Sequence, residues 1–489
     1  MSDPRYEPVI GMEIHAELRT RSKMFCGCPV VDTTVAEPNT AICPVCTGLP
    51  GAMPVVNRRA VEQAMLVGLA LNCDINAFTR FARKNYFYPD LPKGYQISQF
   101  AFPLATGGWI EVETEAGKRV RVGIRQAHME EDTAKSEHVP ALGSGQEATT
   151  RIDFNRSGVP LLEIVSEPDI HSVAAAQAYA VAIREILRYL GVNSGDMEKG
   201  ALRFEANVSV RRRGSDRLGT RTEIKNLNSF RALARAIEYE IERQTEILEA
   251  GGTVIQETLG WNETRRATFS QRSKEYAHDY RYFPEPDLPP LKIDRAWVDE
   301  VGAILPELPQ ARLERFLAEY GLPASDARIL VSERALADYF EAAVAAYAGD
   351  PTAIGNWMVG QLTYLMNREG VGIEDVRVAP QALARLVELV DRETINQQTA
   401  KEVLEEIFET GGAPESVVEE RGLVQISDED ALAQVVDQIL AENPDQVESY
   451  REGQTAVLQW FMGQVMRLTR GRAQPQTVIR LLREKLEGG

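Results

Sequence analysis

The sequence lacks the segments that mark membrane, exported and disulfide-rich proteins. No apolar run approaches the roughly 20 residues that a membrane-spanning helix needs. The first residues, MSDPRYEPVI, do not contain the basic segment followed by an apolar segment that directs export. Five cysteines among 489 residues are too few for a disulfide framework. We therefore expect a cytoplasmic protein that does not enter a membrane.

Familiar nucleotide-binding and hydrolase motifs are also missing. The chain contains no G-x-x-x-x-G-K-[ST] loop and no G-x-G-x-x-G after a strand. Any nucleotide must therefore bind to a different structural element. It has no G-x-S-x-G elbow for a serine nucleophile. The net charge of −18 argues against indiscriminate nucleic-acid binding, although a local basic face can still contact nucleic acid.

The segments that are present predict two or three domains of the α+β class. Residues 1–294 combine strand-like alternation with helices predicted at 172–191 and 229–250. A proline-rich segment, DYRYFPEPDLPPLKI, ends this region. Residues 295–411 and 415–489 follow the period of amphipathic helices, which predicts a helical domain, a linker at the intervening Gly-Gly-Ala-Pro segment and a small helical tail.

The stretch IGMEIHAELR, residues 10–19, alternates with period two and predicts a strand with one face in a core. Its polar face carries Glu13 and His15, which lie roughly 6–7 Å apart along such a strand. A carboxylate and an imidazole so placed can share a cation or a substrate. A solvated outer face is the alternative for any isolated E-x-H pair.

Further acidic residues occur at strand-like positions distant in the chain. Glu131 ends the run H-M-E-E, Glu163 lies within LLEIV in a strand-like run over residues 151–167, and Glu205 belongs to an alternating strand at 203–211. A carboxylate among aliphatic residues is costly to bury unless a cation or a donor meets it. Converging carboxylates suit Mg²⁺, which usually arrives with substrate phosphates. The pattern therefore predicts phosphoryl transfer, provided that these strands converge.

Lysine and aromatic residues are concentrated between residues 83 and 99, in RKNYFYPDLPKGYQISQ. A rigid surface loop packed by its own aromatic rings is one interpretation. If Lys84 or Lys93 is buried instead, it requires a charged partner.

The cysteines are spaced for a metal site. Cys26 and Cys28 form C-x-C, and fourteen residues further on Cys43 and Cys46 form C-x-x-C, each pair beside glycine or proline. This spacing favours a tetrahedral structural zinc over an iron–sulfur cluster or four free thiols. Four thiolates leave no open coordination position, so the metal would hold a loop rather than perform chemistry. Cys73 ends an apolar helical run and is expected in the core.

Basic residues gather in the C-terminal tail of this acidic chain. Such a cluster can contact phosphates, and a solvated helix face explains it equally well. The residues are Arg467, Arg470, Arg472, Arg480, Arg483 and Lys485.

Several long motifs of the chain resemble the GatB family, the B subunits of bacterial aspartyl/glutamyl-tRNA amidotransferases. They are EPVIGMEIHAELRTRSKMFCGC, AICPVCTGLPGAMPVVN, RKNYFYPDLPKGYQISQF, HMEEDTAK, NRSGVPLLEIVSEPDI and DYRYFPEPDL. The resemblance extends over nearly the whole chain and includes GQVMRLTRGRAQPQTV in the tail.

The resemblance implies an antiparallel-sheet cradle domain distantly like glutamine synthetase, then a helical domain and a helical tail that contacts tRNA. Members of this family work with an amidase partner, a glutaminase known as the A subunit, and with a small third protein, the C subunit. They use ATP to phosphorylate the side-chain carboxylate of Glu-tRNA(Gln) or Asp-tRNA(Asn). Ammonia channelled from the glutaminase then displaces the phosphate.

The resemblance also implies roles for particular residues. The Mg²⁺ and ATP site would comprise Glu13, His15, Glu131 and Glu163, with Glu205 as a less secure ligand because the family usually has Asp there. The remaining roles are polar groups at the ammonia channel (Lys84 and Lys93), the zinc knuckle (Cys26, Cys28, Cys43 and Cys46) and tRNA contacts (Arg467, Arg470, Arg472 and Arg480). Apart from the resemblance, ammonium must lose a proton before it can attack, and we expect Glu131, beside a lysine, to accept that proton.

Two other functions remain open on sequence grounds. A non-enzymatic zinc-knuckle adaptor that docks tRNA would explain the cysteines and the basic tail but not the strand-borne acids. A stand-alone ligase related to glutamine synthetase would use free ammonia and a small acid without tRNA.

Overall fold

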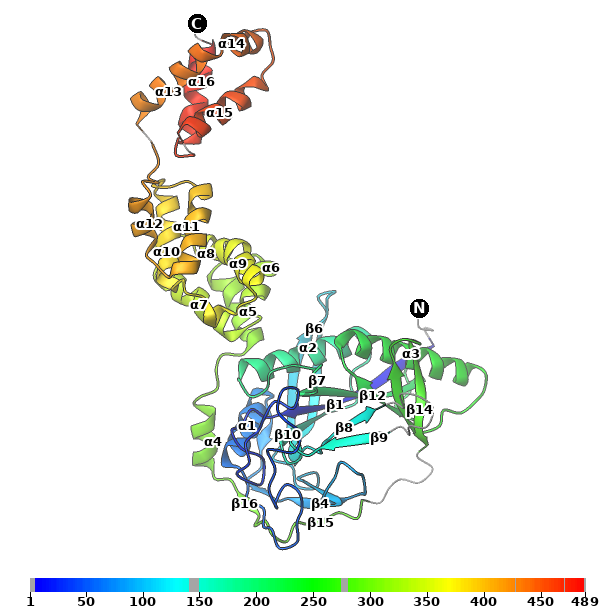
Figure 1. Ribbon diagram of the computed structural model, residues 1–489. Helices are drawn as coiled ribbons and strands as arrows, with labels where there is room; N and C mark the ends of the chain where they lie inside the picture. Colours follow the sequence, from blue (N-terminus) through cyan, green and yellow to red (C-terminus); the bar gives the residue numbers. More distant parts are fainter. Residues whose placement is uncertain (1–4, 140–148, 274–279, 427, 470, 488–489) are drawn as a thin grey trace, which may run out of the picture. The chain divides into compact units, whose positions relative to one another are not determined.

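The computed structural model describes residues 5–139, 149–273, 280–426, 428–469 and 471–487. The chain divides into two compact units, the first ending at Leu308 and the second beginning at Pro309. The first unit contains a large mixed sheet with helices, and the second is helical, so the α+β class is confirmed (Figure 1).

Within the described residues, the first unit is organised around a sheet of twelve strands with β1 near its centre. The path is β14-β13-β12-β11-β1-β10-β7-β5-β4-β15, and β6 pairs with β7 and β2. The resemblance implied an antiparallel sheet. The β12–β13 pair is parallel, however, so the sheet is mixed. The strands are β1 (Tyr6–Glu17), β2 (Asp74–Ile75), β4 (Ala82–Asn85), β5 (Tyr95–Ser98), β6 (Ala105–Glu113), β7 (Arg119–Glu131), β10 (Pro160–Ser166), β11 (Leu202–Arg212), β12 (Thr222–Leu227), β13 (Glu257–Asn262), β14 (Ala267–Ser273) and β15 (Phe283–Pro284).

The period-two pattern of β1 sets the two faces of this sheet. Met12 and Ile14 are fully buried on one face, whereas Glu13 and His15 point to the other. The apolar face is covered by α1 (Arg58–Ala70), α2 (Val173–Tyr189) and α3 (Phe230–Glu249). Both predicted helices are therefore confirmed as α2 and α3, and the opposite face is left for polar chemistry.

The strand-like run expected over residues 151–167 is in fact two strands. The first, β9 (Thr149–Asp153), pairs with β8 (Lys135–Val139) in a separate hairpin, and the second, β10, enters the main sheet. A turn separates them, in which the backbone N–H of Asn155 donates to the Asp153 carboxylate and Gly158 adopts a φ of 85°. Glycine tolerates this left-handed conformation, so the turn breaks the apparent run. A further two-stranded sheet joins β3 (Phe78–Thr79) to β16 (Leu291–Lys292).

The first unit extends beyond residue 294, where the sequence suggested a boundary. Helix α4 (Arg295–Gly302) adds Val298 and Val301 to the core of this unit. These apolar contacts move the division to Leu308.

Among its described residues the second unit has two apolar cores, and the first of them extends beyond the linker that the sequence suggested. Helix α12 (Pro414–Glu420) contributes Val417 and Val418 to the first core, and the second core begins at Leu432. The boundary expected at residue 415 is therefore too early, because these valines are buried. The helices of this unit are α5 (Pro309–Glu319), α6 (Ala324–Leu330), α7 (Arg334–Ala345), α8 (Pro351–Trp357) with a π-helical turn at Met358–Leu362, α9 (Thr363–Glu369), a 3₁₀ turn at Ile373–Asp375, α10 (Pro380–Asp391), α11 (Gln397–Thr410), α12, α13 (Glu429–Glu442), α14 (Pro444–Arg451), α15 (Val457–Leu468) and α16 (Pro475–Glu487).

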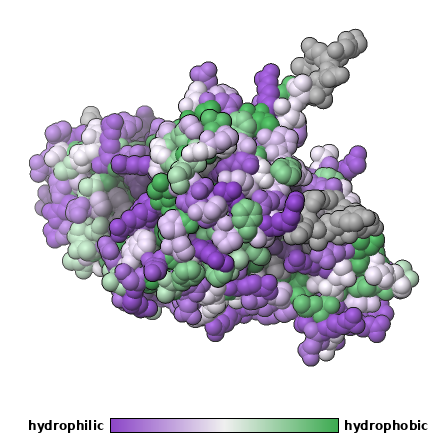
Figure 2. Space-filling model, turned by 90° about the horizontal axis from the view of Figure 1, so that it is seen from below, coloured by the Kyte–Doolittle hydropathy of each residue, from purple (hydrophilic) through white to green (hydrophobic). Residues whose placement is uncertain are grey.

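Among the described residues, none of the helices combines the length and the apolar character that a bilayer-spanning segment requires. On the face shown as a space-filling view, polar and apolar side chains are interspersed rather than gathered into one apolar band (Figure 2).

Candidate functional site

Strand register places a row of ionisable side chains across the polar face of the sheet. Arg203 of β11 is paired with His15 of β1, His15 with Glu163 of β10, and Glu163 with His128 of β7. Directly paired residues project to the same face. Residues separated by up to 188 positions in sequence therefore converge, as the sequence analysis required for Glu163 and His15.

A second row lies beside the first. Glu13 of β1 is paired with Glu205 of β11, and Glu223 of β12 completes a group of carboxylates. The Asn207 amide donates to Glu13 at 2.8 Å. Lys225 contacts Glu205 at 2.9 Å and Glu223 at 3.2 Å, so one ammonium compensates part of the negative charge.

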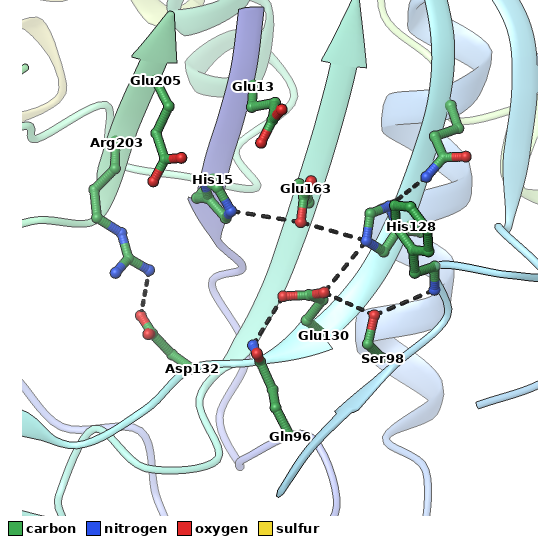
Figure 3. Close-up of polar contacts among 12 residues, drawn as sticks. Glu13, His15, Gln96, Ser98, His128, Glu130, Asp132, Glu163, Arg203 and Glu205 are labelled. Atoms are coloured by element: carbon green, nitrogen blue, oxygen red, sulfur yellow. Dashed lines mark hydrogen bonds and ion pairs between the residues drawn. The ribbon is translucent and has the colours of Figure 1, made fainter. Parts of the chain in front are cut away.

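Two histidines contact the central carboxylate. Nε2 of His15 lies 3.5 Å from Glu163, and Nε2 of His128 lies 3.4 Å from Glu163 and 3.3 Å from Glu130 (Figure 3). Ser98 donates to Glu130 at 2.7 Å, and the Gln96 amide donates to it at 2.8 Å. Two donors from β5 thus fix the position of the Glu130 carboxylate.

The proximity of these groups shifts their pKa values. Burial opposes the charged form of His128, but Glu163 and Glu130 outweigh it and raise the pKa of His128 to about 9. Burial would raise the pKa of Glu163, yet His128 and His15 hold it well below its ordinary value. Burial raises the pKa of Glu13, and the neighbouring carboxylates add to this effect. Several carboxylates therefore lie close together, and a bound cation would reduce the repulsion between them.

The donor chemistry of two clusters fits a divalent cation. His128, Glu130 and Glu163 can bring one ligand atom each within 4.8 Å of one another, and so can Glu13, Glu205 and Glu223 in a second cluster. Carboxylate oxygens are the ligands that Mg²⁺ uses, usually together with water and substrate phosphates. The sheet face therefore offers two adjoining groups of residues suited to magnesium.

A cavity of about 390 Å³ opens beside these clusters. Glu13 and Glu163 line it together with the basic side chains Arg125 and Arg221. Such a volume lies in the range of small-molecule sites. A lining that combines carboxylates with guanidinium groups suits a ligand that carries phosphates and metal ions.

Glu131 does not belong to this polar face. Adjacent residues of a strand point to opposite faces, so Glu130 joins His128 while Glu131 faces away and forms an ion pair with Lys93. The pair lines a separate cavity of about 170 Å³. The expected grouping of Glu131 with Glu13 and Glu163 is therefore not what the structure shows, because the register of β7 directs Glu130 to that position.

Lys84 and Lys93 likewise occupy different places. Lys84 of β4 is paired with Gln96, whose amide donates to Glu130, so Lys84 lies on the side of the acidic clusters. Burial would lower the pKa of Lys84, but the charge of Glu130 outweighs it and raises that pKa. The ammonium of Lys84 also lies 5.3 Å from the ring centre of Tyr280.

His128, Glu130 and Arg203 belong to this polar face but were not predicted from the sequence. His128 and Glu130 are two residues apart, as are Glu13 and His15. This repeated pairing of a histidine with a glutamate could have identified His128 and Glu130 as site residues. Arg203 Nη2 donates to Asp132 at 2.6 Å, while its Nε is buried with no hydrogen-bond partner among the described residues.

The four expected cysteines converge. Cys26, Cys28, Cys43 and Cys46 can each place a sulfur within 4.8 Å of the others, and the sulfurs of Cys43 and Cys46 are 3.9 Å apart. Zinc–sulfur bonds of about 2.3 Å in a tetrahedron would separate sulfurs by about 3.8 Å. The donor set therefore fits a tetrahedral metal ion. Cys73 is buried in the core, as predicted.

The tail arginines differ in their surroundings. Arg467 is exposed on α15, whereas Arg480 forms ion pairs with Glu429 and Glu484. Arg472 donates to the Gly422 carbonyl at 3.0 Å. Arg470 lies outside the described residues. Their contact with tRNA stays a prediction.

Sequence comparisons place this sheet face in a known class of catalytic domain. Residues 8–299 match a family model described as "GatB/GatE catalytic domain", and residues 338–486 match one described as "GatB domain". The first match contains every residue of the two acidic clusters.

Relatives of nearly equal length identify the family of this catalytic domain more closely. The chain is 53% identical to the B subunit of the aspartyl/glutamyl-tRNA(Asn/Gln) amidotransferase of Moorella thermoacetica, over 98% of this chain and 100% of the relative. It is 50% identical to the protein of the same name from Carboxydothermus hydrogenoformans, over 98% of this chain and 99% of the relative. The chain belongs to the GatB family of amidotransferase B subunits.

Proposed function

We propose that the chain is the phosphorylating and amidating subunit of a glutamine-dependent aminoacyl-tRNA amidotransferase. It would convert Glu-tRNA(Gln), Asp-tRNA(Asn) or both into the amidated forms. Family membership supports this proposal. The observation that carries it is the convergence of Glu13, Glu130, Glu163, Glu205 and Glu223 on one face of the sheet.

The reaction must first activate a poor electrophile, because a carboxylate does not release its oxygen to an amine. Transfer of the γ-phosphoryl group of ATP to the side-chain carboxylate of the aminoacyl-tRNA would supply a good leaving group. Magnesium, when bound, would neutralise phosphate charge. In this proposal Glu130, Glu163 and His128 hold one ion, and the cluster of Glu13 and its neighbours holds another.

Cationic side chains around the clusters would stabilise charge on the transferred group. Arg203 donates from Nη2 to Asp132, and its buried Nε has no hydrogen-bond partner among the described residues. Lys84 faces the acidic clusters from β4. Guanidinium and ammonium groups in these positions suit phosphoryl oxygens. The cavity beside Arg125 and Arg221 would receive the nucleotide.

Amidation would use the second cavity. Ammonia is largely ammonium at neutral pH, so delivery of the free amine requires a proton acceptor. Glu131 is positioned for this role beside Lys93, where its side chain is 3% exposed. We infer that this pair belongs to the ammonia route and that displacement of the phosphate occurs on the opposite side of β7.

The remaining features fit one component of a larger enzyme. We propose that a glutaminase (the A subunit of such an enzyme) supplies the ammonia, that a small C subunit stabilises the pair, and that the helical tail contacts tRNA through Arg467 and its neighbours. A zinc ion held by the four cysteines would fix the loop that contains them. In this proposal the first unit is a catalytic cradle with the chemistry of a glutamine synthetase.

Reconstitution with the two partner proteins tests the proposal. The expected result is formation of Gln-tRNA(Gln) or Asn-tRNA(Asn) that requires both ATP and glutamine. An adaptor would show no ATP consumption dependent on aminoacyl-tRNA. A stand-alone ligase would amidate a small acid with free ammonia in the absence of tRNA. Either outcome would overturn the proposal.

A further inference from the structure

The cysteine cluster and the Lys93–Glu131 pair line the same cavity. Cys26, Cys46 and Gly48 form part of its wall, and Lys93 and Glu131 form another part. The side chains of Lys93 and Glu131 are only 8% and 3% exposed. An ion pair this deeply buried is stable only when its geometry is well fixed. Lysine has several freely rotating bonds, so some element must hold its stem.

The turn that follows Cys46 contacts that stem directly. A Cβ atom on Gly48 would lie 2.4 Å from Cγ of Lys93 and 3.0 Å from its Cα, far inside normal contact distance. Gly48 also has a φ of 72°, so glycine is required by space and by backbone conformation. The turn is tied to the metal knuckle, because the Thr47 hydroxyl donates to the Cys43 carbonyl at 2.8 Å.

The knuckle is also joined to the Glu131 side of the cavity. Ser157 donates to the Cys46 carbonyl at 3.0 Å. A Cβ atom on the next residue, Gly158, would lie 3.3 Å from Cβ of Cys46 and 3.9 Å from a carboxylate oxygen of Glu131. The turn between β9 and β10 therefore packs between the cysteine site and the carboxylate.

A buried lysine reinforces this connection. Lys23 is 1% exposed, and its ammonium lies 3.6 Å from the sulfur of Cys46 and 3.2 Å from the Phe154 carbonyl. Four thiolates around a divalent ion carry excess negative charge, and Lys23 places a compensating cation against them. The metal site, Lys23 and the turn at Phe154 thus form one connected structure.

We propose that the metal knuckle is a positioning element for the Lys93–Glu131 pair. Metal binding by the four cysteines fixes the turn at Gly48, and this turn presses the aliphatic stem of Lys93 toward Glu131. The knuckle then affects amide formation without contacting the phosphorylation site. The positioning itself is independent of the proposed function, whereas its effect on amidation rests on the role proposed for this pair.

Two matched glycine variants test the contact in the full-length chain. Gly48→Ala introduces a methyl group against Lys93, whereas Gly51→Ala places one at a φ of 85° with nothing within 4 Å. Both introduce backbone strain, so their difference isolates the contact. Metal content and thermal unfolding of both variants verify that the knuckle is still loaded and folded.

Competitive acetylation with acetic anhydride, followed by mass spectrometry, reports the position of Lys93 without any enzymatic turnover. Exposed Lys118 serves as the internal reference. Gly48→Ala should raise the labelling rate of Lys93 about tenfold, the change that corresponds to loss of one charge-assisted contact. Removal of the metal from the wild-type chain by a chelator should do the same, and Gly51→Ala should leave the rate unchanged.

Activity assays on the reconstituted complex complete the test. Gly48→Ala should lower glutamine-dependent amidation more than Gly51→Ala does, while ATP-dependent phosphorylation is retained in both. Unchanged Lys93 labelling after both Gly48→Ala and metal removal would overturn the inference. A wild-type complex that labels as expected but does not phosphorylate aminoacyl-tRNA would instead refute the proposed function and leave the positioning role standing.

Discussion

The substitution Glu131→Gln separates the structural contribution of the buried ion pair from its role in the reaction. The variant keeps an oxygen that can accept the Ile97 N–H, which Glu131 accepts at 3.0 Å, but removes the charge opposite Lys93. Removing one partner of a buried pair costs about 3–5 kcal/mol because the other charge is left uncompensated. Since part of the hydrogen bonding survives, about 3 kcal/mol is expected.

Differential scanning calorimetry of the metal-loaded chain measures this loss. A decrease of about 3 kcal/mol corresponds to a fall of roughly 5 °C in the Tm of the first unit, which ends at residue 308. The double variant Lys93→Met/Glu131→Gln removes both charges and should recover stability to within about 1 kcal/mol of wild type. It should not recover glutamine-dependent amidation.

Two results would refute this reasoning. A Glu131→Gln variant with unchanged Tm would show that the pair is not a buried, mutually dependent one. Full glutamine-dependent amidation by either variant would remove Glu131 from the ammonia route.

Further predictions concern the metal, the tail and the pH dependence of stability. Cys43→Ser/Cys46→Ser should lose bound zinc and lower Tm while ATP-dependent phosphorylation is retained, as metal analysis and calorimetry would show; normal metal content would contradict the tetrathiolate site. Neutralising exposed Arg467 and Arg483 should weaken tRNA binding and reduce the slope of log K against log salt by about 1–2; an unchanged slope would exclude this face. In the metal-free chain the pKa of His128, raised from 6.5 to about 9, gives stability that is complete below pH 6.5 and lost as pH rises through about 9. Tm measured against pH should show this fall, and His128→Gln should reduce it, leaving the smaller contribution of His15, whose pKa is also raised.

The alternation of β1 predicted its environment correctly because a period of two is a local property. Ile14 and Met12 are buried and His15 lies on the polar face, as the pattern required. The cysteine spacing was equally informative, since a tetrahedral metal restricts how four thiols can be arranged.

The choice between neighbouring acids needed strand register, which the sequence does not contain. Glu130 and Glu131 are adjacent and point to opposite faces, and only the pairing of His128 with Glu163 decides which one joins the acidic clusters. From the sequence, Glu131 was assigned to the Mg²⁺ and ATP site and also to the ammonia channel. The structure places it in the cavity that Lys93 lines.

Tertiary contacts explain the other differences. The turn at Gly158 interrupts what looked like one strand, and Ser157 in this turn donates to the Cys46 carbonyl of the cysteine knuckle. Val298 and Val417 extend two cores past the boundaries suggested by proline and glycine content. Composition identifies where a chain can turn, and burial decides whether a core actually ends there.

The central claim is that carboxylates from separate strands form one site for magnesium and ATP. Transfer of labelled γ-phosphate to mischarged tRNA, measured with the reconstituted complex and withheld glutamine, tests it most directly. Glu163→Gln should reduce this transfer at least about a hundredfold, because it removes charge from the carboxylate at the centre of the site. Phosphoryl transfer at the wild-type rate in Glu163→Gln would contradict the claim.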